Sequence, residues 1–334
     1  MKIWMPVIST STGAEVYVDQ LANGLRQMHH QVIIDKIAQE FQYAPWLARL
    51  KPPQDADVVF ANSWSAVAFA KNKPLVTVVH HVVHDPRLTA HKSVAQKLFH
   101  GALVKPMERA ALRRSDKIVA VSQSTSDAVA AHLSNRPVTV VHNGVDTDFF
   151  SPLQAPPARR SGRMRLLFVG KRSRRKGFDL VMEFARRYTS QIDIGVVGGS
   201  GEPGMDIEGA QLLGRLNNEE LRMAYRSADF LLFPSRLEGY GLVAAEAMAC
   251  GLPVLCLSGG AVEEVVAPPH GGFAAQEEQF VELGKKALAV CSDFDSHQRL
   301  RESARTHALN HHGRKRWLEE MEQVLREAAK VGRE

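Results

Sequence analysis

Residues 234–253 read PSRLEGYGLVAAEAMACGLP, and the order of these residues determines a local structure. The stretch follows a short apolar run that ends at Phe233 and is predicted to be a strand. Gly239 and Gly241 permit an unusual backbone after that strand, and the apolar residues behind them predict a helix that ends at Gly251. A strand, a glycine loop and a helix N-terminus form an anion site, because free amides and the helix dipole point at whatever lies there.

Two carboxylates belong to this stretch. Glu238 lies in the glycine loop, and Glu246 follows eight residues later, about two turns along the predicted helix. At that position Glu246 could accept hydrogen bonds from a polyol such as ribose. The alternative is a solvated carboxylate on a helix surface, but the neighbours of Glu246 are small or apolar, and a charged residue among such neighbours usually has a specific partner.

Short apolar, β-branched runs alternate with helical patterns along the whole chain, which predicts parallel sheets covered by helices on both faces. The proline-rich stretch SPLQAPPARRSGR at residues 151–163 has the composition of a linker, and 334 residues suit two domains. We therefore expect two α/β domains with ligands beyond the carboxyl ends of their strands. The predicted strands are 2–8, 32–34, 58–60, 75–79, 117–121 and 138–141, and then 165–169, 193–197, 228–233 and 253–257.

The composition narrows the possible partners and compartments. A hydrophobic content of 45% with 23% charged residues is typical of a globular protein, and a net charge of +6 favours phosphates, anionic lipids or nucleic acid. Nucleic acid is the poorest of these interpretations, because aromatic residues are not interleaved with the cations. The apolar stretch within the first twelve residues is too short for a secretory leader. No apolar run in the sequence is long enough to span a membrane. Three cysteines without a CxxC pair predict buried thiols in the reducing cytoplasm.

A basic loop is predicted after the strand at 165–169. Lys171, Arg172, Arg174, Arg175 and Lys176 place five cations within six residues, where they repel one another unless an anion joins them. A diphosphate is the natural occupant of such a loop, and a solvated basic loop is the alternative.

Two other patterns could indicate a zinc site and a dinucleotide cofactor, but neither pattern is complete. His80, His81 and His84 follow the strand at 75–79, but no HExxH pattern accompanies them, so zinc is a poorer interpretation than a polar strand end. Glycines at 199, 201 and 204 fit the dinucleotide fingerprint, but Pro203 and the residues after it predict no helix. We therefore do not expect a bound dinucleotide cofactor.

The spacing of Glu238 and Glu246 resembles the EX7E signature of the family 4 (GT4) retaining glycosyltransferases. These enzymes have the GT-B fold, in which two Rossmann-like, doubly wound α/β domains face a central cleft. The resemblance covers most of the chain. It includes TGAE at 12–15, VSQST at 121–125, HNGVD at 142–146, LLFVGKRSRRKGFD at 166–179, VVGGSG at 196–201 and LLGRL at 212–216.

The resemblance implies roles for individual residues. Lys171 and Lys176 would neutralise the leaving nucleotide diphosphate, and Glu238 would orient the donor sugar. His80, with His81 as the alternative, would lie on the reactive side of that sugar. Thr12 and Lys171 stand where the family usually has glycine and arginine. The implied catalytic residues are His80, Lys171, Lys176 and Glu238, and the implied donor-binding residues are Gly13, Arg172, Gly199, Leu216, Glu238, Gly239, Tyr240, Gly241, Leu242 and Glu246, with no metal and no cofactor beside the nucleotide sugar.

The resemblance also implies that the two domains bind different substrates. Residues 1–150 would bind the acceptor, residues 151–313 the UDP- or GDP-linked sugar, and the helix at 314–334 would cross back to the first domain. The expected activity is transfer to a glycan or lipid-linked acceptor in lipopolysaccharide or surface polysaccharide synthesis. A phosphorylase, an epimerase or a catalytically silent sugar-nucleotide-binding module are the alternatives.

Residues 92–117 mix cations with apolar residues, and Pro106 should kink or restart the helix predicted there. This composition fits a helix lying on an anionic membrane, with a solvated helix face as the alternative. We expect a cytoplasmic protein that attaches peripherally to the inner face of the cytoplasmic membrane.

Overall fold

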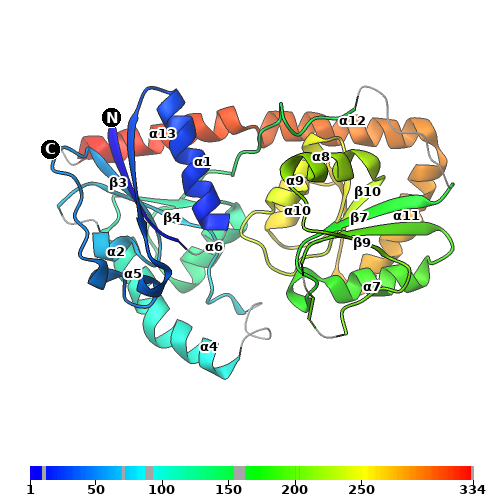
Figure 1. Ribbon diagram of the computed structural model, residues 1–334, viewed down its shortest axis with the longest axis horizontal. Helices are drawn as coiled ribbons and strands as arrows, with labels where there is room; N and C mark the ends of the chain where they lie inside the picture. The colour runs from blue at the N-terminus through cyan, green and yellow to red at the C-terminus, as the bar shows by residue number, and fades with distance from the viewer. Residues whose placement is uncertain are drawn as a thin grey trace. The chain divides into compact units, whose positions relative to one another are not determined.

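The computed structural model describes residues 1–9, 13–69, 72–86, 93–153, 162–199, 201–202 and 204–331. The chain forms two compact units, Met1–His142 with Lys315–Glu334, and Asn143–Arg314 (Figure 1). The second unit begins earlier than the predicted division after residue 150. The reason is that Val145 pairs with Gly313, which ties residues 143–150 to the second unit.

The first unit is built on a six-stranded sheet of order β2-β1-β3-β4-β5-β6, in which all pairs are parallel. Its middle strands are buried along nearly their whole length, as expected for a sheet covered on both faces. The strands are β1 (Lys2–Ile8), β2 (Gln31–Ile37), β3 (Val58–Asn62), β4 (Leu75–Val79), β5 (Lys117–Ala120) and β6 (Thr139–Val140).

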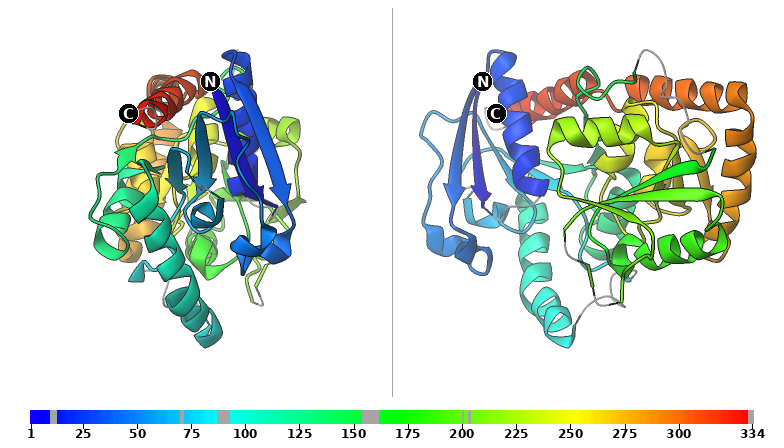
Figure 2. Two further views of the ribbon diagram at one scale, coloured as in Figure 1. Left: turned by 90° about the vertical axis from the view of Figure 1, so that its left-hand side faces the viewer. Right: turned by 45° about the vertical axis from the view of Figure 1, so that its right-hand side comes forward.

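Helices and short helical turns connect these strands (Figures 1 and 2). Pro106 lies in the first turn of a helix that restarts after a π-helical turn, as predicted. The helices are α1 (Gly13–Gln27), α2 (Ala66–Phe69), α4 (Val94–Phe99), α5 (Lys105–Arg114), α6 (Gln123–His132) and α13 (Arg314–Val331), and the turns are η1 (Gln39–Gln42), η2 (Pro45–Ala48) and η3 (His100–Val104).

Helix α13 packs on α1. The indole Nε1 of buried Trp317 donates to the hydroxyl of Tyr17 at 3.3 Å, and their rings meet edge to face. Leu318 lies so close to Gly24 that a Cβ added there would meet its Cδ2 at 2.3 Å. The apolar face of the predicted C-terminal amphipathic helix is therefore buried in the first unit.

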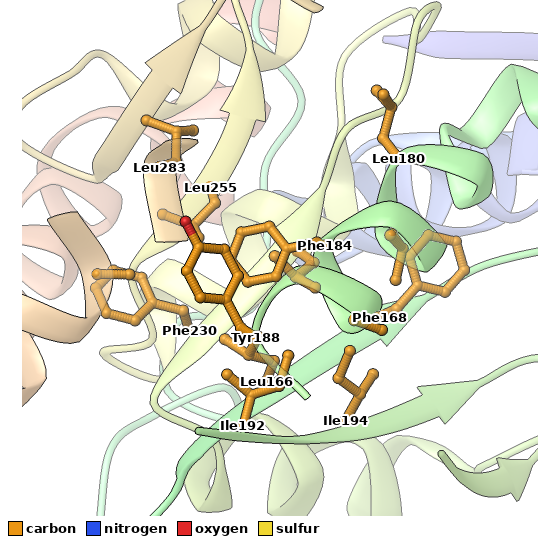
Figure 3. Close-up of a cluster of buried hydrophobic side chains, with 14 of the residues drawn as sticks. Leu166, Phe168, Leu180, Phe184, Tyr188, Ile192, Ile194, Phe230, Leu255 and Leu283 are labelled. Carbon is orange, nitrogen blue, oxygen red and sulfur yellow. The ribbon is translucent and has the colours of Figure 1, made fainter. Parts of the chain in front are cut away.

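The second unit repeats the architecture with a parallel sheet of order β12-β11-β10-β7-β8-β9. Figure 3 shows part of its core, where Phe184 and Tyr188 lie over strand residues that include Leu166 and Ile192. The strands are β7 (Met164–Val169), β8 (Ile192–Val197), β9 (Gln211–Gly214), β10 (Phe230–Phe233), β11 (Val254–Leu257) and β12 (Gly272–Ala275).

The helices of this unit are α7 (Phe178–Arg187), α8 (Asn218–Ser227), α9 (Leu242–Ala249), α10 (Ala261–Val266), α11 (Leu283–Ser292) and α12 (Phe294–His311), with turns η4 (Arg174–Lys176) and η5 (Glu277–Glu282). The predicted helix after the glycine loop is α9, and Gly251 follows it in the left-handed conformation, with φ of 71°. The three cysteines are free and buried, as predicted.

The strand order of each sheet shows where a ligand is expected to bind. In the second sheet the chain runs outward from β7 through β8 to β9, and then starts again at β10 on the other side of β7. In the first sheet the same reversal lies between β1 and β3. Such switch points leave a crevice beyond the carboxyl ends of the two strands, where ligands of doubly wound sheets bind. Within the described residues, no helix is both long enough and apolar enough to cross a membrane.

Candidate functional site

The site of the second unit lies at its switch point, where the loops after β7 and β10 meet. Lys176 from the first loop forms an ion pair with Glu238 from the second. Both side chains are about one sixth exposed, at 17% and 15%. The hydroxyl of Ser235 donates to the same carboxylate oxygen at 2.7 Å, and the ammonium of Lys176 lies 5.7 Å from the ring centre of Phe233. The structure thus brings together two predicted site residues that are 62 positions apart.

Gly177 makes this meeting possible. Its φ is 69°, and a Cβ at this position would lie 1.9 Å from the carbonyl oxygen of Pro234, the first residue of the loop after β10. The two loops therefore touch backbone to backbone directly beside Lys176. Gly198, with φ of 149°, allows the loop after β8 a similar approach to Gly170, where an added Cβ would lie 2.2 Å from the carbonyl oxygen. Glycine is required at both positions because any side chain would push the loops apart.

Three other cations of the basic loop fall into two groups, those with a partner and one without. Arg172 forms an ion pair with Asp206 and donates to the carbonyl of Met205 at 3.3 Å, so its guanidinium already has partners in the loop after β8. Arg175 donates to the carbonyl of Leu237 at 3.1 Å and so braces the loop that carries Glu238. Lys171 is exposed, and its ammonium makes no hydrogen bond or ion pair with the described residues. Of the five cations, Lys176 is the one that joins Glu238.

The glycine loop leads directly into α9. Gly241, with φ of 109°, precedes the helix, and no side chain caps the amides of its first turn, where Leu242 lies. These amides and the N-terminal dipole face the same edge of the sheet as the ends of β7 and β10. Two more predicted residues follow strands at this edge, Gly199 after β8 and Leu216 after β9.

Glu246 lies on α9, where the hydroxyl of Tyr225 from α8 donates to its Oε2 at 3.0 Å. Burial of the carboxylate raises the pKa of Glu246 to about 7, and the bond from Tyr225 lowers it only in part. Burial, followed by the charge of Glu246, also raises the pKa of Tyr225. Glu246 is therefore an acid whose charge is poorly solvated, rather than a freely solvated carboxylate.

In the first unit, His80 lies at the end of β4, as predicted. Its Nε2 is 3.2 Å from Oδ1 of Asn62, which ends β3, and its ring meets Tyr17 edge to face at 4.7 Å. Burial, with a smaller contribution from His81, lowers the pKa of His80 to about 3. The ring is therefore neutral at physiological pH, with Nε2 donating to Asn62 and Nδ1 left as an acceptor.

The remaining predicted positions of the first unit lie at the start of α1 and in the segment after β4. Gly13 opens α1, and Thr12 lies outside the described residues. His81 is exposed, whereas His84 has a buried side chain with its Nε2 3.3 Å from Oε2 of Glu108. No three His, Cys, Asp or Glu side chains among the described residues gather as metal ligands. The element that follows the glycines at 199, 201 and 204 is strand β9 and not a helix, as predicted.

Four partners of the predicted residues were not predicted from the sequence: Ser235, Tyr225, Asn62 and His312, the last of which bonds to Tyr240. Ser235 carried a usable signal, because it stands three residues before Glu238 in the same loop. The others come from distant segments, and only the folded chain shows which residue they reach.

Two family models match the chain. One, described as Glycosyl transferases group 1, matches residues 152–307, and the other, described as Glycosyltransferase Family 4, matches residues 35–149. The chain belongs to glycosyltransferase family 4. The predicted enzyme class, a glycosyltransferase, is confirmed at this level. Together the two matches cover most of both units and include the loops that carry Lys176 and Glu238.

Curated relatives agree with this assignment. An uncharacterized glycosyltransferase, MJ1178 of Methanocaldococcus jannaschii, is 29% identical over 65% of this chain and 62% of its own length. A D-inositol 3-phosphate glycosyltransferase of Catenulispora acidiphila is 29% identical over 83% of this chain and 72% of its own length. For several other relatives of the same name, the matched segment spans about half of the relative or less.

Solved structures share the fold over nearly the whole chain. Sucrose-phosphate synthase from Thermosynechococcus elongatus superposes with a TM-score of 0.83 at 17% identity, covering 99% of this chain and all of that one. WaaG, a glycosyltransferase involved in lipopolysaccharide biosynthesis, gives 0.75 at 18% identity, covering 97% and 99% of the two chains. These similarities confirm the predicted GT-B architecture of two Rossmann-like α/β units.

Proposed function

We propose that this family 4 glycosyltransferase moves a sugar from a UDP- or GDP-linked donor to a hydroxyl of a glycan or lipid-linked acceptor, with retention of the anomeric configuration. The observation that carries the proposal is the Lys176–Glu238 pair at the switch point of the second sheet. A cation and a carboxylate meet there beside the N-terminus of α9, which no side chain caps, and this arrangement suits a diphosphate with a sugar attached.

The proposed step breaks the bond between the anomeric carbon and the diphosphate oxygen and forms a bond from that carbon to the acceptor oxygen. The electron pair of the broken bond stays on the diphosphate, where Lys176 and the amides around Gly241 stabilise it. The acceptor proton leaves with the diphosphate or to solvent. Glu238 accepts hydrogen bonds from sugar hydroxyls, and Glu246 accepts them from the ribose. Departure and attack on the same face of the sugar retain its configuration.

His80 and Lys171 complete the proposal. Neutral His80 offers Nδ1 as an acceptor to a sugar hydroxyl, and exposed Lys171 adds positive charge after β7. Lys176 and the loop amides can supply the charge neutralisation that other enzymes obtain from a cation, so we propose that transfer needs no metal ion. Turnover unchanged by EDTA would support this part, and turnover restored only by added divalent metal would contradict it.

Named relatives and structures support the choice of substrates. HepE from Anabaena has been solved with UDP and glucose, at a TM-score of 0.72 and 18% identity over 97% of this chain and 99% of that one. WaaG is involved in lipopolysaccharide biosynthesis. We therefore propose UDP sugars as the first donors to test and a lipopolysaccharide or surface polysaccharide precursor as the acceptor.

The experiment is a panel of UDP and GDP sugars, assayed for thermal stabilisation and for acceptor-dependent release of the nucleoside diphosphate. A donor at 100 times its Kd should add about 2.7 kcal/mol to the free energy of unfolding. Lys176→Ala should abolish stabilisation and turnover, and Lys285→Ala, an exposed lysine paired with Glu282, should change neither. Binding without release of diphosphate in the wild type would instead indicate a silent sugar-nucleotide-binding module.

We also propose that the first unit attaches to an anionic membrane in the cytoplasm. Helix α4 exposes Val94 and Leu98 at 73% and 68%, beside the exposed cation Lys97. The ring of Phe99 meets Tyr43 at 5.5 Å, which links α4 to the end of the turn η1, and Trp46 and Leu47 of the next turn, η2, are also exposed. Apolar and aromatic side chains interspersed with lysine suit the interfacial region of an anionic bilayer.

Vesicle flotation tests this attachment. The protein should float with vesicles that contain phosphatidylglycerol and not with pure phosphatidylcholine vesicles. Leu98→Ser should weaken flotation, whereas Leu212→Ser, at an exposed leucine of the second unit, should not. Equal flotation of both variants with the wild type would show that α4 is a solvated helix surface.

A further inference from the structure

His312 is buried in the second unit directly after α12, and it contacts the glycine loop that carries Glu238. Its Nδ1 lies 2.6 Å from the hydroxyl of Tyr240, which stands between the two loop glycines and is itself only 3% exposed. Its Nε2 lies 2.9 Å from the carbonyl oxygen of Val265 in α10. No step of the proposed reaction uses this histidine.

The two bonds determine the hydrogen positions. A carbonyl oxygen can only accept, so Nε2 of His312 carries the hydrogen and donates it to Val265. In the neutral ring Nδ1 is then an acceptor, and the hydroxyl of Tyr240 donates to it. The ring therefore acts as a bridge from the end of α10 to the tip of the glycine loop, with both of its nitrogens used.

His312 is also tied to the start of the second unit through its backbone. Its amide bonds to the carbonyl of Ala308 at 2.9 Å, and its own carbonyl accepts from the amide of Val145 at 2.8 Å. Gly313 pairs with Val145, and the amide of Arg314 returns a bond to the carbonyl of Val145 at 2.9 Å. One residue thus joins the glycine loop to the two segments at which the chain enters and leaves this unit.

We propose that His312 is a positioning residue for the donor, which holds Tyr240 so that the loop from Glu238 to Gly241 keeps its shape around the diphosphate sugar. The inference rests on the proposed function and extends it to a residue outside the family's glutamate motif. Two glycines make the loop flexible by themselves, so a buried anchor between them helps to fix the direction of its amides, while Lys176 and Ser235 hold the Glu238 carboxylate.

The test measures the donor KM, the acceptor KM and kcat of Tyr240→Phe, His312→Phe and the double variant. Each single variant should raise the donor KM about fivefold, the change expected for one net hydrogen bond, and leave the acceptor KM within twofold. The double variant should be no worse than either single one, because neither partner is then left unsatisfied and His307 still donates to Val265 at 3.1 Å. Two controls in the same unit are Tyr188→Phe, which loses a 3.0 Å bond to Val281, and His297→Phe.

Additive losses in the double variant, or equal losses in the two controls, would overturn the positioning role. An unchanged donor KM in both single variants would overturn it as well. If the wild type binds UDP but transfers no sugar, the proposed function fails. Calorimetric Kd values for UDP in the same variants then test the positioning role of His312, and each single variant should bind UDP about fivefold more weakly. If the wild type does not bind UDP at all, both the proposed function and the positioning role fail.

Discussion

Replacing Glu246 by glutamine should change how the stability of the protein depends on pH. The carboxyl group ionises near 4.5 in a model compound, and burial raises its pKa to about 7 in the folded protein. Between these pH values the folded protein retains a proton that the unfolded chain has released. The free energy of unfolding therefore falls as pH rises from 4.5 to 7 and then stays level.

The size of this effect follows from the two pKa values. Each tenfold difference in proton affinity corresponds to about 1.4 kcal/mol, so the wild type should lose up to about 3 kcal/mol above pH 7 relative to pH 4.5. Glutamine cannot ionise, and its amide oxygen can still accept the hydrogen bond from Tyr225. Glu246→Gln should thus be stabilised relative to the wild type at pH 8.5 and nearly equal to it at pH 5.

Urea unfolding at pH 5, 6, 7 and 8.5, monitored through a spectroscopic probe in the second unit, measures the effect. Glu183→Gln is the matched control, because Glu183 is an exposed carboxylate on α7. A difference between Glu246→Gln and the wild type that is the same at pH 5 and at pH 8.5, like that of the control, would refute the claim that this carboxylate is poorly solvated.

Three further predictions concern other parts of the structure. Gly177→Ala should destabilise the second unit by several kcal/mol more than Gly162→Ala in a urea titration, because both glycines have φ of 69° but only Gly177 has a backbone oxygen 1.9 Å from the added Cβ; equal losses would exclude that contact. Trp317→Ala should cost about 3 to 5 kcal/mol of unfolding free energy, and Trp46→Ala, at a half-exposed indole, should cost little; a small effect at Trp317 would show that α13 is not part of the first core. The ring signals of His80 in NMR spectra should not shift between pH 8 and 5, since burial lowers its pKa to about 3, and a titration midpoint near 6.5 would contradict a buried neutral ring.

The sequence predicts the central strands well and the edges of the second sheet poorly. Strands β1 and β4 have the predicted bounds, because continuous apolar runs between turn residues are unambiguous in a doubly covered sheet. Strands β9 and β12 were not predicted. Three of the four residues of β9 are exposed, and β12 reads GFAA, so neither shows a continuous run of large apolar residues.

The candidate site was also predicted in part. The loops that carry Lys176 and Glu238 follow predicted strands, and the strand order brings them together as the doubly wound interpretation requires. The partner of Arg172 could not be predicted, because Asp206 lies in an irregular loop with no periodic signal. The bond from His312 to Tyr240 joins residues 72 positions apart, and no local pattern indicates it.

The most direct test of the central claim is a crystal structure of the full chain soaked with UDP. We expect the diphosphate to lie beyond the carboxyl ends of β7 and β10, with Nζ of Lys176 and the amides near Gly241 within hydrogen-bonding distance of its oxygens. A nucleotide bound elsewhere, or no density at saturating UDP and at saturating GDP, would contradict the claim.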